Sequence, residues 1–343
     1  MGIVMKRMVL LATALAMVSG SAMAADMPLK AVKAPPPPAF DPWDLAFGSA
    51  IMNDYIFRGV TQSNHNASVA AYFEPRYNVT KDLQLYVGTS AESISFANRA
   101  AAEVDIYGGI RPTFGPAAFD FGVWGYLYPG GSCADNVVTV FPGPVAVPGG
   151  NVCPVSTTTI FLGDGNVMKK NVSFLEVYGK LNYTVNDNWA FGVNEFYSPN
   201  FLNSGAWGNY ASLTGKYTAP STIFGSSGVG MYVSGEFGRQ WLGTSDAFYG
   251  TGPGTIFARG IPYASYDTWN IGIGFTYKVF TLDLRYSDTD LSKGNCNAFT
   301  SAFNGTGTTN ITPINPTGVG SNWCGAAGIA KLSADLTAMS NLK

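Results

Sequence analysis

Apolar and polar side chains alternate with period two along most of the chain. The clearest run is 267–277, where Trp269, Ile271, Ile273, Phe275 and Tyr277 alternate with Asn270, Gly272, Gly274 and Thr276. Residues 173–185 and 280–287 repeat the pattern. Because successive side chains of a strand point to opposite faces, each run predicts a strand with one apolar and one polar face.

The alternating segments are mostly about 10–13 residues long, the length that a tilted strand needs to cross a bilayer. Twelve are predicted: 45–58, 67–79, 83–96, 102–114, 118–128, 172–185, 188–198, 209–218, 229–242, 266–278, 280–291 and 325–337. An apolar face toward lipid and a charged face toward a lumen are typical of outer-membrane barrels, which close so that no strand edge is left unpaired. We therefore expect an all-β fold, a closed antiparallel transmembrane β-barrel of about 12 strands.

The predicted connections alternate in length. Tight turns are expected at 79–82, 114–117, 185–188 and 278–280, and mostly longer loops at 64–66, 129–171, 199–208, 243–265 and 292–324. Short periplasmic turns and long extracellular loops are typical of barrels in the outer membrane of a Gram-negative bacterium. Both chain termini would then lie on the periplasmic side.

The first residues indicate export. Lys6 and Arg7 precede an apolar stretch at 8–18 that is too short to span a bilayer, and small residues lead up to Ala24. We interpret 1–24 as a signal peptide cleaved near Ala24. Residues 25–43, with four consecutive prolines at 35–38, are interpreted as a Pro-rich periplasmic linker, and 44–343 as the barrel.

Composition supports a membrane barrel. Charged residues make up 12% of the chain, against about 25% in soluble domains, and aromatic residues 14%. The formal net charge is −2 without a basic patch, so nucleic acid is not an expected partner. Expected partners are outer-membrane lipid and the barrel-assembly machinery. Aromatic pairs near strand ends fit interfacial girdles: Tyr55 and Phe57, Tyr126 and Tyr128, Trp189 and Phe191, and Phe237 and Trp241.

The cysteines favour disulfides over a metal site. There are four, none in a CxxC pair, and the chain has a single histidine, so no metal or cofactor is expected. In an oxidising compartment we expect Cys133 to pair with Cys153 and Cys296 with Cys324, each pair within one loop region. Closing loops of this size would stabilise the fold by roughly 3 kcal/mol each.

Five motifs resemble the TorF-type putative porins of proteobacteria. They are MNDYIFRGVTQS at 52–63, EVDIYGG at 103–109, YLYPG at 126–130, LEVYG at 175–179 and RYSDTDL at 285–291. The resemblance extends over 44–343 and implies an outer-membrane barrel with a transport role and no catalytic residues. One departure is the end of the chain, Ser340 to Lys343, which lacks the aromatic residue usual in such barrels. The last strand is expected to stop near Leu336.

Inward positions of the predicted strands carry charges of both signs, which predicts a pore for passive diffusion of ions or small polar solutes. The expected pore-lining residues are Asp54, Arg58, Glu74, Arg76, Asp105, Arg111, Asp120, Glu176, Lys180, Lys216, Glu236, Asp283 and Arg285. The alternative is that these charges pair across the lumen and close it, leaving a structural or surface-display barrel. Twelve strands lie between filled eight-stranded barrels and open sixteen-stranded porins. The transported solute and the oligomeric state stay open.

Arg58 is the best single candidate for a lumen-lining cation. Asp54 lies four positions earlier, so on one strand the two would share a face about 13 Å apart. Tyr55 and Phe57 would then point outward. The alternative is an arginine buried in a salt bridge with a neighbouring strand at the rim.

A membrane-embedded hydrolase is a less favoured alternative. His65 lies in an expected surface loop beside Ser63 and Ser68, and a short loop does not hold a catalytic triad in place. Glu103 and Asp105 would share a strand face, which is compatible with glycosidase chemistry. Their expected surroundings are solvent or basic partners. We expect a protein that is not an enzyme.

Overall fold

The computed structural model describes residues 42–131, 137–140, 143–146, 169–246, 260, 262–300, 302, 306–307 and 319–342. The expected signal peptide, all but the last residues of the expected linker, and the Cys133–Cys153 pair lie outside these residues. The first strand begins at Trp43, inside the stretch expected to be linker.

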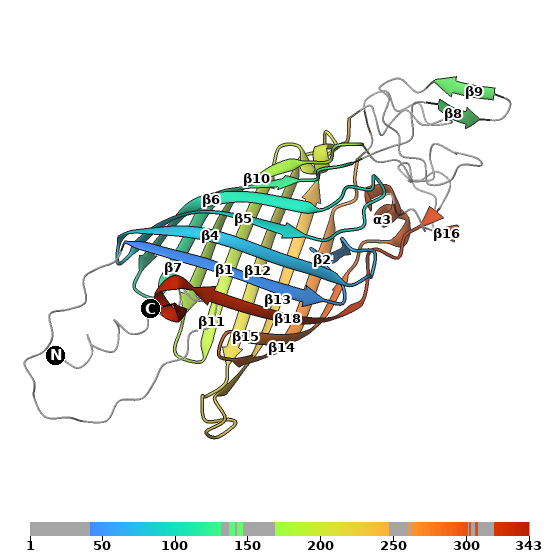
Figure 1. Cartoon of the computed structure of the whole chain (residues 1–343). Helices are drawn as coiled ribbons and strands as arrows, with labels where there is room; N and C mark the ends of the chain where they lie inside the picture. The colour runs from blue at the N-terminus through green and yellow to red at the C-terminus, as the bar shows by residue number, and fades with distance from the viewer. Residues whose placement is uncertain are drawn as a thin grey trace, which may run out of the picture.

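Twelve antiparallel strands of the described chain close into one barrel (Figure 1), as predicted. They are β1 (Trp43–Met52), β4 (Ser68–Thr80), β5 (Leu83–Glu92), β6 (Glu103–Phe114), β7 (Ala117–Leu127), β10 (Phe174–Thr184), β11 (Trp189–Ser198), β12 (Gly208–Thr218), β13 (Val229–Leu242), β14 (Tyr266–Tyr277), β15 (Phe280–Thr289) and β18 (Ala327–Thr337). Each pairs with its neighbour in this sequence, and β1 pairs with β18 to close the ring. Closure leaves no strand edge exposed to lipid.

Two of the expected strands are too long. β1 ends at Met52 instead of residue 58, and β5 ends at Glu92 instead of residue 96. All other strand ends lie within two residues of those predicted. The chain after Met52 leaves the barrel wall, because residues 53–67 form a separate small hairpin of β2 (Ile56–Phe57) and β3 (Val60–Thr61).

The remaining elements lie at the ends of the barrel. At one end are 3-10 helix η1 (Phe201–Asn203), helix α3 (Lys293–Thr300), and the strand pairs β8 (Val137–Val140) with β9 (Gly143–Ala146) and β16 (Thr306–Gly307) with β17 (Val319–Gly320). The short helix α4 (Ala338–Asn341) follows β18 at the opposite end (Figure 1). We call these the loop end and the terminal end. No helix of the described chain is long and apolar enough to cross a membrane.

The two faces of the wall differ as the alternation predicts. Large apolar side chains on the outer face are exposed, for example Val177 (51%), Ile271 (58%) and Leu284 (42%). Their strand neighbours Glu176 and Asp283 point inward and are buried. A continuous apolar outer surface is what a bilayer requires of a barrel.

Inward tyrosine rings lie flat on glycines of the neighbouring strand. A Cβ added to Gly88 would lie 2.4 Å from the Tyr107 ring, and one added to Gly274 would lie 2.0 Å from the Tyr232 ring. Gly48, Gly109, Gly122 and Gly238 accept Tyr72, Tyr86, Tyr178 and Tyr210 in the same way. A ring that lies along the wall takes less of the lumen than one that projects into it, so the glycines keep lumen space free.

The predicted Cys296–Cys324 disulfide is present, with the two Cα atoms 6.0 Å apart. It joins α3 to the segment that enters β18, within the long connection between β15 and β18. The cross-link therefore fixes this connection over the loop end of the barrel.

The strand register allows the outer and inward faces of β14 to be compared by mutation. Ile273→Arg places a charge on the apolar outer face and is expected to lower the free energy of unfolding by roughly 2–4 kcal/mol if the residue lies near the bilayer midplane. Thr276→Arg, on the inward face of the same strand, is the matched control and should cost much less. Reversible unfolding in lipid measures both. Equal losses would contradict the register, because a one-residue slip exchanges the faces.

Candidate functional site

Residues 53–67, here called the inward segment, fold into the lumen at the loop end. Asp54 closes the segment on itself, because its Oδ1 accepts hydrogen bonds from the hydroxyls of Thr61 (2.5 Å) and Ser63 (3.0 Å). The turn between β2 and β3 has positive φ at Arg58 (48°) and Gly59 (78°). A Cβ at residue 59 would lie 2.6 Å from Thr268 Oγ1, so only glycine fits this close to the wall.

Arg58 reaches across the lumen to the opposite wall. Its Nη1 and Nη2 donate to Oε1 and Oε2 of Glu176 on β10, at 2.8 Å and 2.7 Å, and Nη1 also donates to Gln240 on β13 (3.0 Å). The guanidinium lies over the rings of Tyr210 (4.4 Å) and Phe196 (5.0 Å). These four partners come from β10 to β13, which face β1 across the closed ring.

This ion pair is fully enclosed. The side chains of Arg58 and Glu176 are 6% and 0% exposed, and Tyr126 also donates to Glu176 (3.2 Å). A two-point arginine–carboxylate contact is among the strongest hydrogen-bonded pairs in proteins. It therefore holds the inward segment against the far wall.

The expected strand positions of the inward segment were wrong. Because β1 ends at Met52, Asp54 and Arg58 do not share a strand face, and Tyr55 and Phe57 point inward instead of into an outer girdle. The Tyr55 hydroxyl donates to Glu103 (2.6 Å), and the Phe57 ring packs on Tyr126 at 5.8 Å between centroids.

Two more aromatic residues expected in the girdle are inside. Tyr126 and Tyr128 are each 5% exposed and belong to a buried cluster that also contains Phe96, Phe174 and Trp323. Of the other expected girdle residues, Trp189, Phe191, Phe237 and Trp241 are exposed, as predicted. The buried cluster and the inward segment together fill the lumen at the loop end.

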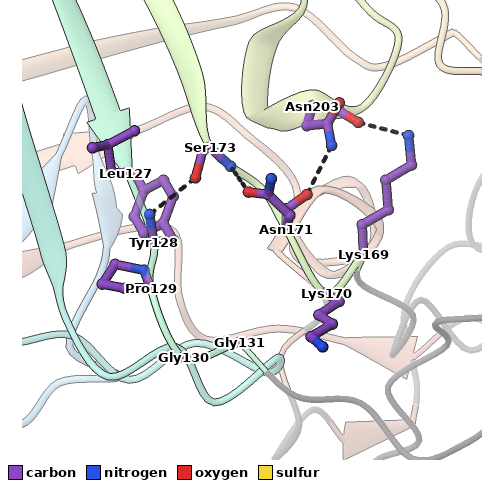
Figure 2. Close-up of a pocket in the computed structure, with 10 residues that line it drawn as sticks. All are labelled: Leu127, Tyr128, Pro129, Gly130, Gly131, Lys169, Lys170, Asn171, Ser173 and Asn203. Carbon is purple, nitrogen blue, oxygen red and sulfur yellow. Dashed lines mark hydrogen bonds between the residues drawn. The ribbon is translucent and has the colours of Figure 1, made fainter.

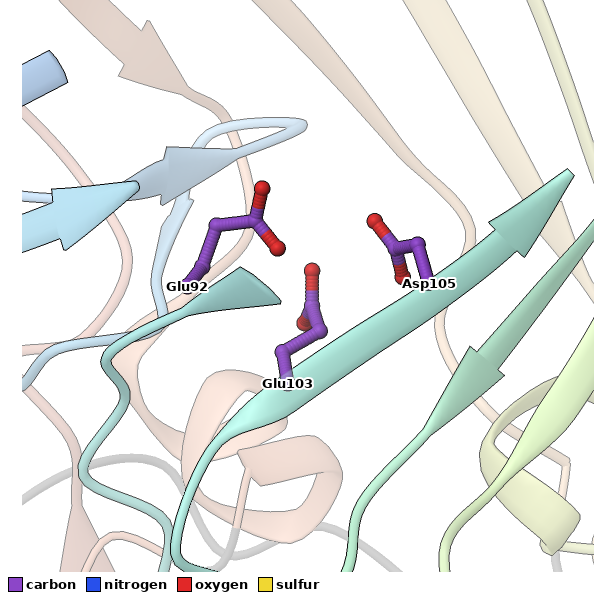
Figure 3. A group of neighbouring side chains, drawn as sticks. All are labelled: Glu92, Glu103 and Asp105. Atoms are coloured by element: carbon purple, nitrogen blue, oxygen red, sulfur yellow. The ribbon is translucent and has the colours of Figure 1, made fainter. Parts of the chain in front are cut away.

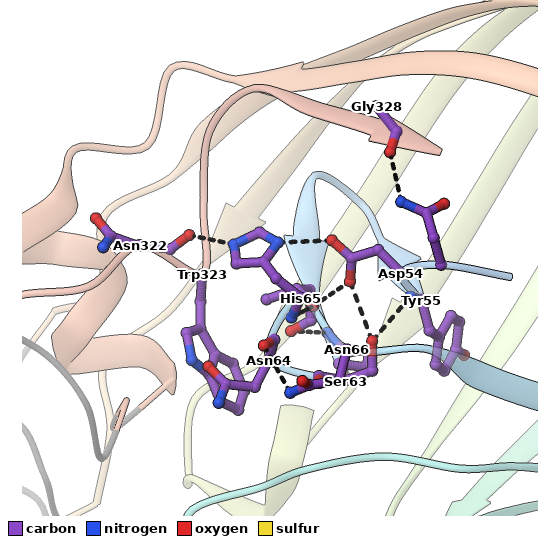
Figure 4. A network of polar contacts seen from close by, with 12 residues as sticks. Asp54, Tyr55, Ser63, Asn64, His65, Asn66, Asn322, Trp323 and Gly328 are labelled. Atoms are coloured by element: carbon purple, nitrogen blue, oxygen red, sulfur yellow. Dashed lines mark hydrogen bonds and ion pairs between the residues drawn. The ribbon is translucent and has the colours of Figure 1, made fainter. Parts of the chain in front are cut away.

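His65 ties the inward segment to the connection before β18 (Figure 4). Its Nδ1 lies 2.6 Å from Asp54 Oδ2 and its Nε2 lies 2.6 Å from the backbone oxygen of Asn322. Both partners are acceptors, so only the protonated ring can donate to both. Burial lowers the pKa of His65, but the hydrogen bonds to Asn322 and Asp54 outweigh it and raise the pKa above its ordinary value of 6.5.

The same network does not have the order of a catalytic triad. Ser63 Oγ donates to Asp54 and accepts from the backbone N–H of Tyr55, while both nitrogens of His65 are used elsewhere. A serine nucleophile needs the histidine as its direct base. The histidine expected to be a solvated loop residue is thus a half-buried link between two loops.

At the terminal end, charged side chains pair along the wall. Glu74 accepts from Arg76 (2.6 Å) and Arg111 (2.7 Å), and Arg111 also donates to Asp120 (3.1 Å). These side chains lie on β4, β6 and β7, which belong to one run of four consecutive strands, β4 to β7. Arg111 and Asp120 remain 28% and 18% exposed. These ion pairs therefore run along the wall and do not join opposite sides of the barrel.

A second wall group lies on β13 to β15. Arg285 donates to Asp283 (3.0 Å), Asn270 (2.5 Å) and Ser234 (2.8 Å). Lys331, which the sequence reasoning missed, pairs in register with Asp283 and is exposed. The presence of a lysine opposite an inward carboxylate could be recognised only once the β15–β18 register was known.

The remaining expected lumen residues also point inward. Lys180 and Lys216 lie over the rings of Tyr178 (4.6 Å) and Tyr232 (4.4 Å), and Glu236 accepts from Tyr210 (2.9 Å). The wall residues of the expected set thus have inward-pointing side chains, whereas Asp54 and Arg58, which were expected on the first strand, belong to the inward segment.

Glu103 and Asp105 do not have the expected surroundings. They are 2% and 3% exposed, and with Glu92 they form an acidic trio whose oxygens lie within 4.8 Å of one another (Figure 3). No member of the trio has an ion pair within the described part of the chain. Glu92 was missed because it meets Glu103 only through the β5–β6 register.

A pocket opens at the loop end between β7 and β10 (Figure 2), lined by Leu127, Tyr128, Pro129, Gly130, Gly131, Lys169, Lys170, Asn171, Ser173 and Asn203. Most of its polar groups bind one another. Lys169 Nζ donates to the backbone oxygen of Asn203 (2.7 Å), and Asn203 Nδ2 donates to the backbone oxygen of Asn171 (2.9 Å). The pocket thus presents few free donors to a ligand.

The comparisons with known proteins point to no specific activity. A family described as "Bacterial protein of unknown function (Gcw_chp)" matches residues 38–158, which include the inward segment and the acidic trio. The match covers about a third of the chain, and it does not confirm the TorF-type name. No curated protein matches the chain.

Several solved structures resemble the chain distantly. An outer membrane channel from Pseudomonas putida F1 has a TM-score of 0.41 and 11% identity, over 86% of this chain and 95% of that chain. LpxR from Salmonella typhimurium has a TM-score of 0.36 and 8% identity (85% and 99%). A FadL homologue from Pseudomonas aeruginosa has a TM-score of 0.36 and 10% identity (86% and 89%). These distant likenesses carry no argument about activity.

The His65 contacts predict a raised pKa that NMR can measure without ambiguity, because the chain has one histidine. In histidine-labelled protein we expect His65 to titrate above 6.5, and Asp54→Asn to lower its pKa. A raised pKa means that the link stabilises the fold fully below pH 6.5 and that this contribution is lost as pH rises through the folded-state pKa. Asp82→Asn, in an exposed turn, is the matched control. Titration of the unmodified protein at or below 6.5 would contradict the two contacts.

Proposed function

We propose that this protein is an outer-membrane channel for small polar solutes or ions whose loop end is closed by the inward segment and opens when that segment moves. The observation that carries the proposal is the contrast between the two halves of the lumen. At the terminal end, ion pairs run along the wall, as between Arg111 and Asp120. At the loop end, one ion pair, Arg58 with Glu176, runs across.

The wall charges support a water-filled path at the terminal end. Although they point inward, Arg111, Asp120 and Arg285 keep 28%, 18% and 22% of their side chains exposed. Charges of both signs on a lumen wall hold water and bias the passage of ions or polar solutes. A barrel that served only as a surface scaffold would not need a hydrated charged interior, which makes the display alternative the weaker proposal.

The inward segment supports gating. It is a single connection between β1 and β4, and its described links to other parts of the chain include two that depend on charge, at Arg58 and at His65. Loops that close over a path are expected to move on slower timescales than side chains. No catalytic role is assigned to any residue in this proposal.

Channel recordings on variants without the transverse ion pair test the proposal. Arg58→Met with Glu176→Gln removes both charges together, so that neither is left buried and unpaired. In planar bilayers we expect the double variant to have a severalfold higher open probability or conductance than the unmodified protein. Arg99→Met, an exposed arginine at the same end of the barrel, is the matched control and should leave conductance unchanged.

Folding of each variant is checked by heat-modifiable mobility on gels. A folded double variant that conducts no more than the unmodified protein would show that the inward segment does not gate a path. A folded protein in which neither form conducts would favour the closed scaffold instead.

A further inference from the structure

The acidic trio of Glu92, Glu103 and Asp105 brings three carboxylates together on two neighbouring strands, β5 and β6. In the β5–β6 register Glu92 lies directly opposite Glu103, and Ser90 lies directly opposite Asp105. Like charges placed directly opposite one another on a sheet destabilise it. The trio therefore needs to be neutralised inside the barrel, either by protons or by a cation.

No described side chain supplies that cation. None of the three carboxylates makes an ion pair in the described part of the chain, and Arg58 is engaged by Glu176. Lys331 acts on Glu92 electrostatically without forming an ion pair. One lysine at a distance leaves three converging carboxylates with excess negative charge.

A second observation points to a ligand at this place. Asp105 is only 3% exposed, yet its Oδ1 has no hydrogen-bond partner. Glu92 Oε2 is also buried without a partner. The indole nitrogen of Trp124 lies close to Asp105 but falls short of a hydrogen bond to it. Buried carboxylate oxygens are normally paired, so two without partners in one acidic cluster indicate a missing partner.

The other oxygens of the trio are held in place. Tyr55 and Tyr128 donate to Oε1 and Oε2 of Glu103, at 2.6 Å and 2.8 Å, and Ser90 donates to Asp105 Oδ2 (2.9 Å). Hydrogen bonds of this kind orient the carboxylates that ligate a metal ion. Each Glu103 oxygen still has a lone pair for a ligand.

We propose that Glu92, Glu103 and Asp105 form a binding site for a divalent cation, with Ca²⁺ as the best-fitting ion. Ca²⁺ binds oxygen ligands at about 2.3–2.6 Å, so two ligands on opposite sides of one ion are separated by up to roughly 5 Å. The 4.8 Å limit on the trio's oxygens falls within that span (Figure 3). Mg²⁺, with bonds of about 2.0–2.1 Å, would require the trio to contract.

The site touches the inward segment through Tyr55, whose hydroxyl binds Glu103. An ion that fixes Glu103 would also fix Tyr55 and so favour the closed position of the segment. The ion site itself does not rest on the channel proposal, because the ion would bind whether or not solutes pass.

Terbium luminescence on the purified full barrel in detergent, stripped of metal with a chelator, tests the site. Trp124 lies beside Asp105 and should sensitise Tb³⁺ bound there. We expect saturable sensitised emission that Ca²⁺ displaces. Asp105→Asn and Glu92→Gln should each weaken Ca²⁺ binding at least about tenfold, since loss of even an outer-sphere partner costs roughly 10–100-fold.

Glu195→Gln is the matched control, because it removes an exposed carboxylate on the outer face of β11 and should leave binding unchanged. Heat-modifiable gel mobility confirms that each variant is folded. Glu92→Gln is the variant least expected to misfold, because Glu92 is only half-buried. Absence of saturable Ca²⁺ binding by the unmodified protein, as expected if protons neutralise the trio, would overturn the proposal. So would equal binding by the unmodified protein and both trio variants.

Discussion

The closed half of the lumen depends on one buried ion pair, Arg58 with Glu176. A charge taken out of water is costly unless it is paired and hydrogen-bonded. Glu176 gives Arg58 a two-point contact, Gln240 accepts a further hydrogen bond, and two aromatic rings cover the guanidinium. If either charge were alone, water would be its better environment. We therefore assign the pair the role of fixing the position of the inward segment. Its net contribution to the stability of the fold is the smaller effect.

Other parts of the loop end reinforce this position. The backbone N–H of Thr61 donates to the Trp323 oxygen (2.8 Å), and His65 binds the Asn322 oxygen. Both acceptors lie next to Cys324, which the disulfide joins to α3. The connection before β18 and the inward segment therefore form one unit. In the proposed channel, opening would require that unit to separate from the β10–β13 wall, which Arg58 contacts through Glu176.

The strands could be predicted from the sequence because period-two alternation is a property of each strand alone. Alternation could not show that β1 stops at Met52, since Asp54, Tyr55, Phe57 and Arg58 continue the same period after the chain has left the wall. The inward placement of Tyr126 was, by contrast, available: it has the same parity as Asp120, which was expected to point inward. An aromatic side chain near a strand end can belong either to an interfacial girdle or, as Tyr126 does, to a buried cluster.

Features that depend on register could not be predicted. Glu92 meets Glu103, Lys331 meets Asp283, and the tyrosine rings meet their glycines only when two strands are aligned residue by residue. A one-residue shift would abolish each of these contacts while leaving the alternation intact. The acidic trio is thus a product of strand pairing, and so is the packing of the inward tyrosines on glycines.

A double-mutant cycle on Arg58 and Glu176 tests the transverse ion pair most directly. The free energy of unfolding in lipid is measured for the unmodified protein, Arg58→Met, Glu176→Gln and the combination. Each single variant is expected to lose roughly 3–5 kcal/mol, because it leaves one buried charge without its partner. The double variant should lose clearly less than the sum of the two. Losses that simply add would show that Arg58 and Glu176 do not meet inside the barrel.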